Sequence, residues 1–280
     1  MSLLSPLSVD RCVIRDTASK KGRTMAVTPG ATASRYLHYG RIILDPADHL
    51  AFDTGDRETG LVCLKGSGQV SVEGGSHPVS HPVKPFDALY VPRDARVEIV
   101  SGPSGVDLAE LSAPVTTRHP VQLVRYDEVT RDAGLHFRTG SDASRRELNI
   151  LLGKNVKAGR IMAGVTFSDP GNWTSWPPHE HAAMLEEAYL YLDMPWPAFG
   201  IQLVYTDPRT PELAVVVREG DCVLMPEGYH PNVAAPGGRI NFLWMMAANR
   251  EEVDRQFGVV NVQPDFAGGA SGLEKGRAQR

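Results

Sequence analysis

Two histidines separated by a single residue, His179 and His181, are the first candidates for chemistry in this sequence. On a β-strand, side chains two residues apart point to the same face, so both imidazoles can reach a common point. A third imidazole, His230, lies downstream in the turn-forming segment Pro226-Glu-Gly-Tyr-His230. Three imidazoles on neighbouring strands of a barrel would bind a divalent transition metal and leave coordination positions open for a substrate.

The adjacent carboxylates Glu186 and Glu187 are candidates for a fourth ligand. Neighbouring residues of a strand face opposite sides of the sheet, so only one of the two can face the histidines. Glu187 alternates with Tyr189 and Tyr191, whereas Glu186 alternates with aliphatic residues. An inward-facing site lined by tyrosines favours Glu187 as the ligand, with Glu186 as the alternative.

The composition is that of a globular protein with enough material for a core. The chain has 280 residues, of which 42% are hydrophobic and 22% charged, and these proportions are ordinary for soluble proteins. The 27 glycines and 21 prolines, together with short runs of Val, Ile, Leu and Tyr, predict many strands joined by turns. A net charge of −4 without basic blocks argues against a nucleic-acid partner.

The three cysteines, Cys12, Cys63 and Cys222, are odd in number and far apart. This argues against a disulfide framework and favours a reducing cytoplasm. The N-terminus has no signal-peptide pattern, and no apolar run is long enough to cross a bilayer. We therefore expect a cytoplasmic protein without a membrane partner.

Two segments of the chain resemble each other weakly. Residues 86–92 and 220–226 each contain an aspartate, four mostly apolar residues and a proline, followed by a turn and another strand. Where the second copy has His230, the first has Arg96, and the first copy has no His-x-His. The repeat predicts an all-β fold of two related barrels, of which only the second binds a metal.

The expected boundaries follow from this repeat. We predict an N-terminal domain without metal ligands over residues 1–130 and a metal-binding domain over residues 131–265. Residues 249–257 are predicted to form a short helix. Residues 266–280, which are rich in glycine, alanine and charge, are expected to form a frayed tail.

The histidine segments resemble the two signature motifs of the cupin superfamily. The motifs are His179-Glu-His181 with Glu186-Glu187-Ala-Tyr189, and Gly220, five residues, then Pro226-x-Gly228-x-His230. The wider segments Gly171-Asn-Trp-Thr-Ser-Trp-Pro-Pro-His179 and Pro226-Glu-Gly-Tyr-His-Pro231 are similar to the 5-deoxyglucuronate isomerase family of myo-inositol catabolism. That family is a relative, with two cupin domains, of 5-keto-4-deoxyuronate isomerase of pectin breakdown. The resemblance is strong over residues 158–247 and looser over residues 36–152.

The resemblance implies an all-β bicupin with two tandem jelly-roll-like barrels. It implies an aldose–ketose isomerase that converts 5-deoxy-D-glucuronate to 5-dehydro-2-deoxy-D-gluconate, with one divalent transition metal (Zn, Mn, Fe or Ni) held by His179, His181, Glu187 and His230. Such a reaction passes through an enediol, and a cation bound to the substrate oxygens stabilises the growing negative charge. A neighbouring base then moves the proton between adjacent carbons.

Proximity in sequence gives four candidates for this proton transfer: Glu186, Tyr189, Tyr191 and Tyr229. For the tyrosines, packing or substrate orientation is the favoured role. The substrate carboxylate would require an arginine or lysine as its partner. Four arginines are candidates, although a surface position is expected for each: Arg145, Arg146, Arg160 and Arg239.

Three other functions stay open, because a fold does not fix a function. They are isomerisation of a related deoxy-keto-uronate, an Fe-dependent dioxygenase reaction, and sugar binding without catalysis. An isomerase should turn over without O₂, which separates it from the dioxygenase. The expected partner is a small sugar-acid substrate, and a homodimer is plausible because edge strands of such barrels often pair between subunits.

Overall fold

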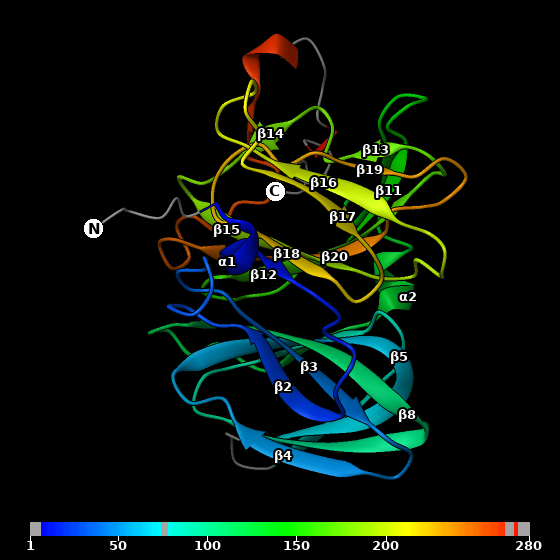
Figure 1. Cartoon of the computed structure of the whole chain (residues 1–280). Coiled ribbons are helices and arrows are strands. Elements are labelled where there is room, and N and C mark those ends of the chain that lie inside the picture. The colour runs from blue at the N-terminus through cyan, green and yellow to red at the C-terminus, as the bar shows by residue number, and fades with distance from the viewer. Residues whose placement is uncertain (1–6, 74–77, 267–271, 274–280) are drawn as a thin grey trace.

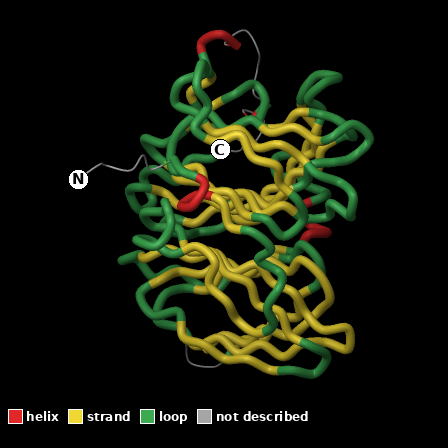
Figure 2. The backbone as a smooth tube through the Cα atoms, viewed as in Figure 1, coloured by secondary structure: helices red, strands yellow, loops and turns green. Residues whose placement is uncertain are grey.

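The structure, a computed structural model, describes residues 7–73, 78–266 and 272–273. Strands dominate this part of the chain, and its helical segments are single turns at α1 (Val9–Cys12), α2 (Tyr126–Val129) and Pro264–Phe266. Figure 1 shows two groups of strands stacked one above the other, and Figure 2 shows that strands far outnumber the short helical turns. The predicted all-β fold is confirmed. No helix among the described residues is long and apolar enough to span a membrane.

The lower group in Figure 1, the N-terminal half, is a folded antiparallel sheet with the strand order β2-β3-β8-β5-β7-β9, with β4 on β8 and β6 on β5. Its strands are β2 (Gly22–Val27), β3 (His38–Leu44), β4 (His49–Asp53), β5 (Arg57–Glu73), β6 (Val79–Val83), β7 (Ala88–Val91), β8 (Arg96–Pro114) and β9 (Gln122–Val124). The long strands β5 and β8 change register near Gly66. A Cβ on Gly66 would lie 2.1 Å from the carbonyl oxygen of Gly105, and φ is 74°, so the bend requires glycine.

The upper group, the C-terminal half, contains a seven-stranded antiparallel sheet with the order β1-β18-β15-β20-β12-β11-β10. Its strands are β1 (Val13–Ile14), β10 (His136–Thr139), β11 (Arg146–Leu152), β12 (Ile161–Ser168), β15 (Leu185–Tyr191), β18 (Cys222–Met225) and β20 (Phe242–Ala248). A four-stranded sheet, β13-β19-β16-β17, consists of β13 (Trp173–Thr174), β16 (Gly200–Val204), β17 (Leu213–Val217) and β19 (Asn232–Ala234). The short strands β14 (His179–Glu180) and β21 (Asn261–Val262) pair with each other.

One hydrophobic core extends across the two halves, and a second core lies within the N-terminal half. A single cluster joins Tyr39, Val62 and Leu111 of the N-terminal half to Leu190 and Met245 of the C-terminal half. Strands β15, β18 and β20 are buried at every residue. Burial on both faces of a strand removes the need for polar residues at alternate positions, so β18 and β20 are continuous apolar runs. In β15 the run is interrupted by the buried pair Glu186 and Glu187.

Two buried glutamates connect the halves in a reciprocal way. Glu58 on β5 accepts hydrogen bonds of 2.8, 2.6 and 2.8 Å from the backbone N–H groups of residues 159–161. Glu186 on β15 accepts hydrogen bonds of 2.7, 2.6 and 2.5 Å from the backbone N–H groups of residues 35–37. Each carboxylate thus satisfies three main-chain donors where a strand of the other half starts, and these donors would otherwise be buried without partners.

Two aspartates of the repeated segments have equivalent partners. Asp87 accepts a hydrogen bond of 2.8 Å from Arg125, directly after β9, and Asp221 accepts one of 2.6 Å from Arg15, directly after β1. Strand β9 pairs with β7 of the N-terminal half, whereas β1 pairs with β18 of the C-terminal half. The first strand of the chain therefore lies in the half that contains the histidines.

The short helix predicted over residues 249–257 is not present. The segment forms turns in which Glu252 has a φ of 61° and Asp254 accepts hydrogen bonds from the backbone and side chain of Arg250. A carboxylate that binds a nearby backbone N–H competes with helical hydrogen bonds, which explains the error. Of the predicted tail over residues 266–280, only Phe266, Gly272 and Leu273 belong to the described residues.

Candidate metal centre

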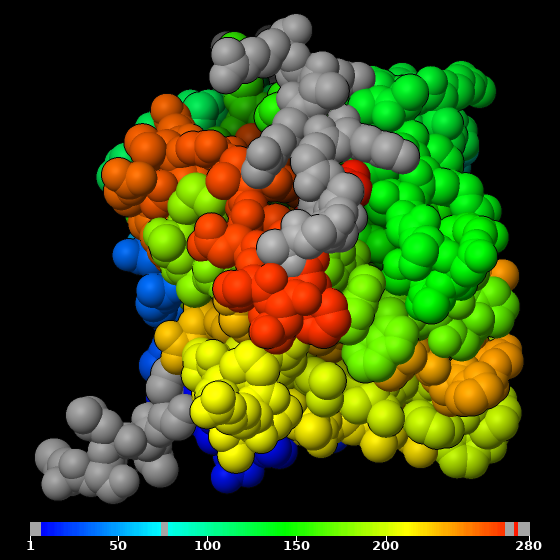
Figure 3. Space-filling view, turned by 90° about the horizontal axis from the view of Figure 1, so that it is seen from above, coloured from blue at the N-terminus to red at the C-terminus, as the bar shows by residue number. Residues whose placement is uncertain are grey.

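The three histidines lie on short segments around the inside of the C-terminal half. His179 begins β14, His181 follows that strand directly, and His230 lies in the turn before β19. Gly228, two residues before His230, has a φ of 88°, and a Cβ there would lie 2.7 Å from the Tyr205 carbonyl oxygen. The turn that aims His230 inward therefore requires glycine. Figure 3 shows the molecule from above, and the orange-red segment that includes β21 lies across the upper end of the C-terminal half.

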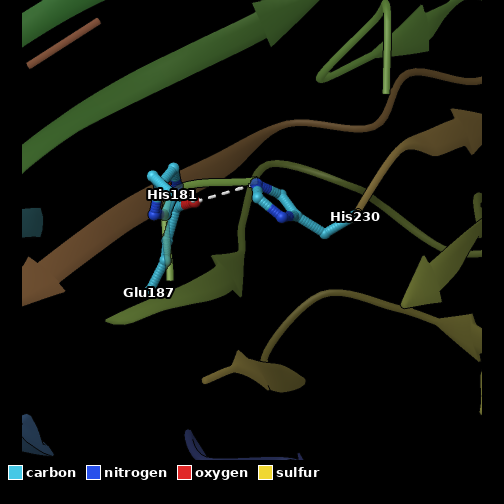
Figure 4. A group of neighbouring side chains, drawn as sticks. All are labelled: His181, Glu187 and His230. Atoms are coloured by element: carbon cyan, nitrogen blue, oxygen red, sulfur yellow. Dashed lines mark hydrogen bonds and ion pairs between the residues drawn. The ribbon is translucent and has the colours of Figure 1, made fainter. Parts of the chain in front are cut away.

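The side chains of His181, Glu187 and His230 meet at one point (Figure 4). The Oε2 atom of Glu187 lies 3.0 Å from Nε2 of His181 and 3.1 Å from Nε2 of His230. The ring of His179 lies beside this group of three, with its centroid 5.0 Å from that of His230. All four side chains are buried, with at most 5% of any residue exposed.

The hydrogen bonds of the imidazoles fix which nitrogen faces the centre. The Nδ1 atoms of His179, His181 and His230 lie 2.9, 3.1 and 2.9 Å from the carbonyl oxygens of Pro177, Leu185 and Gly228. A carbonyl can only accept a hydrogen bond, so each neutral ring donates from Nδ1 and carries its lone pair on Nε2. Backbone acceptors commonly orient metal-binding histidines in this way.

This set of donors fits a metal ion. The Nε2 lone pairs of His181 and His230 lie at about hydrogen-bond distance from Oε2 of the Glu187 carboxylate. A lone pair and an anionic oxygen repel each other at this distance unless a cation or a proton lies between them. Among the described residues, Nε2 of His230 is buried and has no hydrogen-bond partner in good geometry. Imidazole nitrogens and a carboxylate oxygen are ligands for divalent transition metals. Of the predicted ligand set, His181, Glu187 and His230 bring their ligand atoms close together, and His179 lies beside them.

Burial and the neighbouring groups set the charges of this cluster. Burial, with smaller contributions from His230 and His181, lowers the pKa of His179 to about 3. Burial would raise the pKa of Glu187, but its close contacts with His181 and His230 bring it down to about 2. Burial opposes a charge on His181, yet the contact with Glu187 raises its pKa overall. A neutral His179 and an ionised Glu187 are the states that metal binding requires.

A cavity of about 40 Å³ adjoins His179 and Glu187. Arg146, Thr166 and Tyr189 line it from the seven-stranded sheet, Ser175 lines it from the segment before β14, and Leu273 lines it from the C-terminal end of the described chain. The hydroxyl of Tyr189 is 2.7 Å from Oγ of Ser175, and its ring stacks on Phe242 with 4.0 Å between centroids. Burial raises the pKa of Tyr189 well above its ordinary value.

Of the predicted catalytic residues, Tyr189 lies at the cavity, whereas Glu186 and Tyr229 do not. Glu186 faces the other side of β15, where its carboxylate binds the backbone of residues 35–37. Tyr229 is half-buried against Tyr205, with 5.7 Å between ring centroids, and is not among the described residues that line the cavity. The hydroxyl of Tyr191 donates to Oε1 of Gln202 at 2.6 Å. Proximity in sequence was a poor guide because adjacent residues of a strand face opposite ways.

Among the candidate arginines, Arg146 lines the cavity and is 2% exposed, so its predicted surface position is wrong. Arg145, its neighbour, is exposed and pairs with Asp142. Arg160 donates to the carbonyl oxygens of Pro114, Ala248 and Asn249, and Arg239 lies near the carbonyl of Ser168. The alternation of Arg146 with Leu148 and Ile150 on β11 was the signal that could have identified it as inward-facing.

Fold and site together define an all-β, cupin-like protein whose buried histidine–glutamate cluster is suited to a metal ion. The chain belongs to the KduI/IolB family, which it matches over residues 13–261. It is 32% identical over 243 residues to 5-deoxy-glucuronate isomerase of Geobacillus kaustophilus, an alignment that covers 82% of this chain and 86% of the relative. The same enzyme of Shouchella clausii is 30% identical over 203 residues, covering 67% and 72% of the two chains.

Two solved structures have the same fold. An IolB-like protein of Salmonella typhimurium superposes with a TM-score of 0.77 at 22% identity, covering 91% of this chain and 98% of that one. Oxalate decarboxylase of Bacillus subtilis superposes with a TM-score of 0.62 at 11% identity, covering 88% and 78%. At these identities the likeness concerns the fold alone. The family predicted from the motifs is confirmed, and so is the prediction that the chain is an isomerase.

Proposed function

We propose that this protein is a metal-dependent aldose–ketose isomerase that converts 5-deoxy-D-glucuronate to 5-dehydro-2-deoxy-D-gluconate in myo-inositol catabolism. The observation that carries this proposal is the convergence of Nε2 atoms and the Glu187 carboxylate beside a cavity. The relatives named 5-deoxy-glucuronate isomerase support the choice of substrate.

The metal would be one divalent ion of Zn, Mn, Fe or Ni, held by His179, His181, Glu187 and His230. When bound, it supplies a Lewis acid that stabilises negative charge on the substrate oxygens. Overall, a proton on the carbon next to the aldehyde moves to the aldehyde carbon, and a hydroxyl proton moves between the two oxygens. The reaction is redox-neutral within the substrate and needs no external oxidant.

The other cavity residues orient the substrate and move protons. Tyr189 is the best-placed of the predicted catalytic residues, because its hydroxyl reaches the cavity and is hydrogen-bonded to Ser175. This pair can pass a proton to or from a substrate oxygen. The apolar side chains of Phe242, Trp244 and Met246 on β20 form a wall that limits the entry of water.

We further propose that the two halves are two copies of one cupin barrel, divided near residue 130, and that the first copy binds no metal. The reciprocal contacts of Glu58 and Glu186, and the equivalent contacts of Asp87 and Asp221, support this duplication. In this arrangement β1 precedes the strands of the first barrel in the chain but pairs with β18 of the second barrel. Three buried, free cysteines suit a cytoplasmic protein, and a homodimer remains part of the proposal.

Elemental analysis of the purified protein, followed by NMR of 5-deoxy-D-glucuronate incubated with it without O₂, tests the proposal. We expect one metal ion per chain and conversion to the ketose. The double variant His179→Ala/His181→Ala should lose both, whereas the control His49→Ala, at an exposed position on β4, should keep both. An unchanged sugar in the presence of metal would refute the substrate, and full turnover by the double variant would refute the metal mechanism. In a parallel incubation under air, consumption of O₂ would instead indicate a dioxygenase.

A further inference from the structure

We propose that Gln263 is a positioning residue of the metal centre, which fixes His179 relative to His230. This inference rests on the proposed function, because it takes these imidazoles to be ligands of one metal ion. It assigns a role to the C-terminal strap, by which we mean residues 257–266. The strap belongs to the segment that crosses the upper end of the C-terminal half in Figure 3.

His179 is held in place differently from the other predicted ligands. The ligand atoms of His181, Glu187 and His230 lie within 4.8 Å of one another, whereas His179 lies beside them, with its ring centroid 6.4 Å from that of His181. Glu187 lies on β15, which pairs with both β18 and β20. His179 lies on β14, whose only partner among the described strands is β21 of the strap. A pair of two-residue strands has few contacts and is locally weak, so other contacts from the strap are needed to hold His179.

The backbone of Gln263 holds the segment that leads into His179. Its N–H group, directly after β21, donates to the carbonyl oxygen of Pro178 at 2.9 Å. The ring of Phe266 packs edge-on against that of Trp176, with 4.9 Å between the centroids. The strap therefore contacts the residues before His179 through both main chain and side chains.

The side chain of Gln263 reaches the segment of the other imidazole. Its Oε1 atom accepts a hydrogen bond of 2.7 Å from the hydroxyl of Tyr205. Tyr205 in turn exchanges two backbone hydrogen bonds, of 3.0 and 2.8 Å, with Tyr229. Tyr229 directly precedes His230 in the chain. One residue thus connects the segment of His179 to the segment of His230.

The surroundings of Gln263 make this connection rigid. The residue is 4% exposed, and its Nε2 donates to Oδ2 of Asp265 at 2.9 Å. A carboxylate only accepts hydrogen bonds, so the NH₂ group faces Asp265 and the amide oxygen faces Tyr205. With both ends of the amide paired, the side chain is held in one orientation. Residues outside the ligand set commonly fix metal ligands in this way.

The first test measures Zn²⁺ affinity by competition with a chelator in wild type, Gln263→Ala, Tyr205→Phe and the double variant. Loss of a residue that orients a ligand weakens metal binding about 10- to 100-fold, and we expect about 10-fold in each single variant. The double variant should lose less than about twofold more, because both substitutions break the same hydrogen bond. The matched control Tyr90→Phe removes a buried hydroxyl that donates to Glu58, and its Zn²⁺ affinity should stay within about twofold of wild type.

The second test separates positioning of His179 from a general loss of stability. In a His179→Ala background, Gln263→Ala should weaken Zn²⁺ binding by less than about twofold, because the imidazole that it positions is gone. The visible absorption of bound Co²⁺ depends on the number and geometry of the ligands. In Gln263→Ala it should shift from the wild-type spectrum towards that of His179→Ala.

Three results would overturn the positioning role: unchanged affinity in Gln263→Ala, additive losses in the double variant, or an undiminished loss in the His179→Ala background. None of these measurements requires turnover, so they test the inference whichever sugar is the substrate. A wild-type protein that binds no Zn²⁺ would refute the proposed metal centre, and the inference with it.

Discussion

The substitution Glu186→Gln separates a structural role of this residue from a catalytic one. The two carboxylate oxygens of Glu186 accept three backbone N–H groups, two at Oε1 and one at Oε2, and Oε2 also lies 3.6 Å from Nε of Arg35. Glutamine keeps the shape but replaces one oxygen with an NH₂ group, which cannot accept. At least one buried N–H then loses its partner, and the remaining hydrogen bonds lose the assistance of the negative charge.

The expected loss of unfolding free energy is about 3 kcal/mol, which combines about 1–3 kcal/mol for an unsatisfied buried group with the weakening of the other bonds. For a chain of this size the melting temperature should fall by about 6–12 °C. Metal content and kcat/KM at 25 °C should stay within about threefold of wild type, which corresponds to less than 1 kcal/mol. The measurements are thermal unfolding by circular dichroism, elemental analysis and steady-state kinetics.

Two matched variants complete the test. Glu128→Gln makes the same chemical change at an exposed position and should alter stability by less than about 0.5 kcal/mol. Glu58→Gln changes the equivalent contact in the other half, where three backbone N–H groups and the Tyr90 hydroxyl bind the carboxylate, and should cost about as much as Glu186→Gln. A Glu186→Gln protein with unchanged melting temperature and a hundredfold loss of kcat would refute the reasoning and make Glu186 the catalytic base.

Further predictions concern the cluster, the cavity and the cysteines. Glu187→Gln removes the anionic ligand and should weaken metal binding by at least about 100-fold, measured by competition with a chelator. Tyr189→Phe should reduce kcat by about 100-fold with metal content unchanged, whereas Tyr229→Phe should stay near wild type; equal effects would contradict the placement of Tyr189 at the reacting end. Burial raises the pKa of the Cys63 thiol to about 12, and all three cysteines are buried and free, so a thiol reagent at pH 8 should label none in the native protein and three after denaturation. Rapid native labelling would refute their burial.

The sequence predicts those features of the site that depend on strand alternation and on the residues of a single turn. The two-residue period of strands predicted that Glu187 and not Glu186 faces the histidines, and the Pro-x-Gly turn brings His230 to His181 and Glu187 because Gly228 can adopt a positive φ. His181 lies just outside the two-residue strand β14, so strand alternation alone does not place it. The all-β fold follows from the same alternation combined with frequent turn residues.

What the sequence could not provide are contacts between residues far apart in the chain. Glu186 looked like a second site carboxylate, and its role became clear only from partners some 150 residues away. The pairing of β1 with β18 likewise depends on the packing of the two halves, and no local pattern encodes it. Arg146 differs in this respect, because its alternation with Leu148 and Ile150 on β11 is a local signal for an inward-facing side chain.

The central claim is that three imidazoles and the Glu187 carboxylate bind one divalent ion. X-ray absorption at the metal edge tests it most directly, with chelator-treated protein reloaded with one equivalent of Zn²⁺. We predict one ion per chain with three imidazole ligands, and loss of imidazole signal in His230→Ala. A stoichiometry near zero, or a spectrum without imidazole ligands that His230→Ala leaves unchanged, would contradict the account.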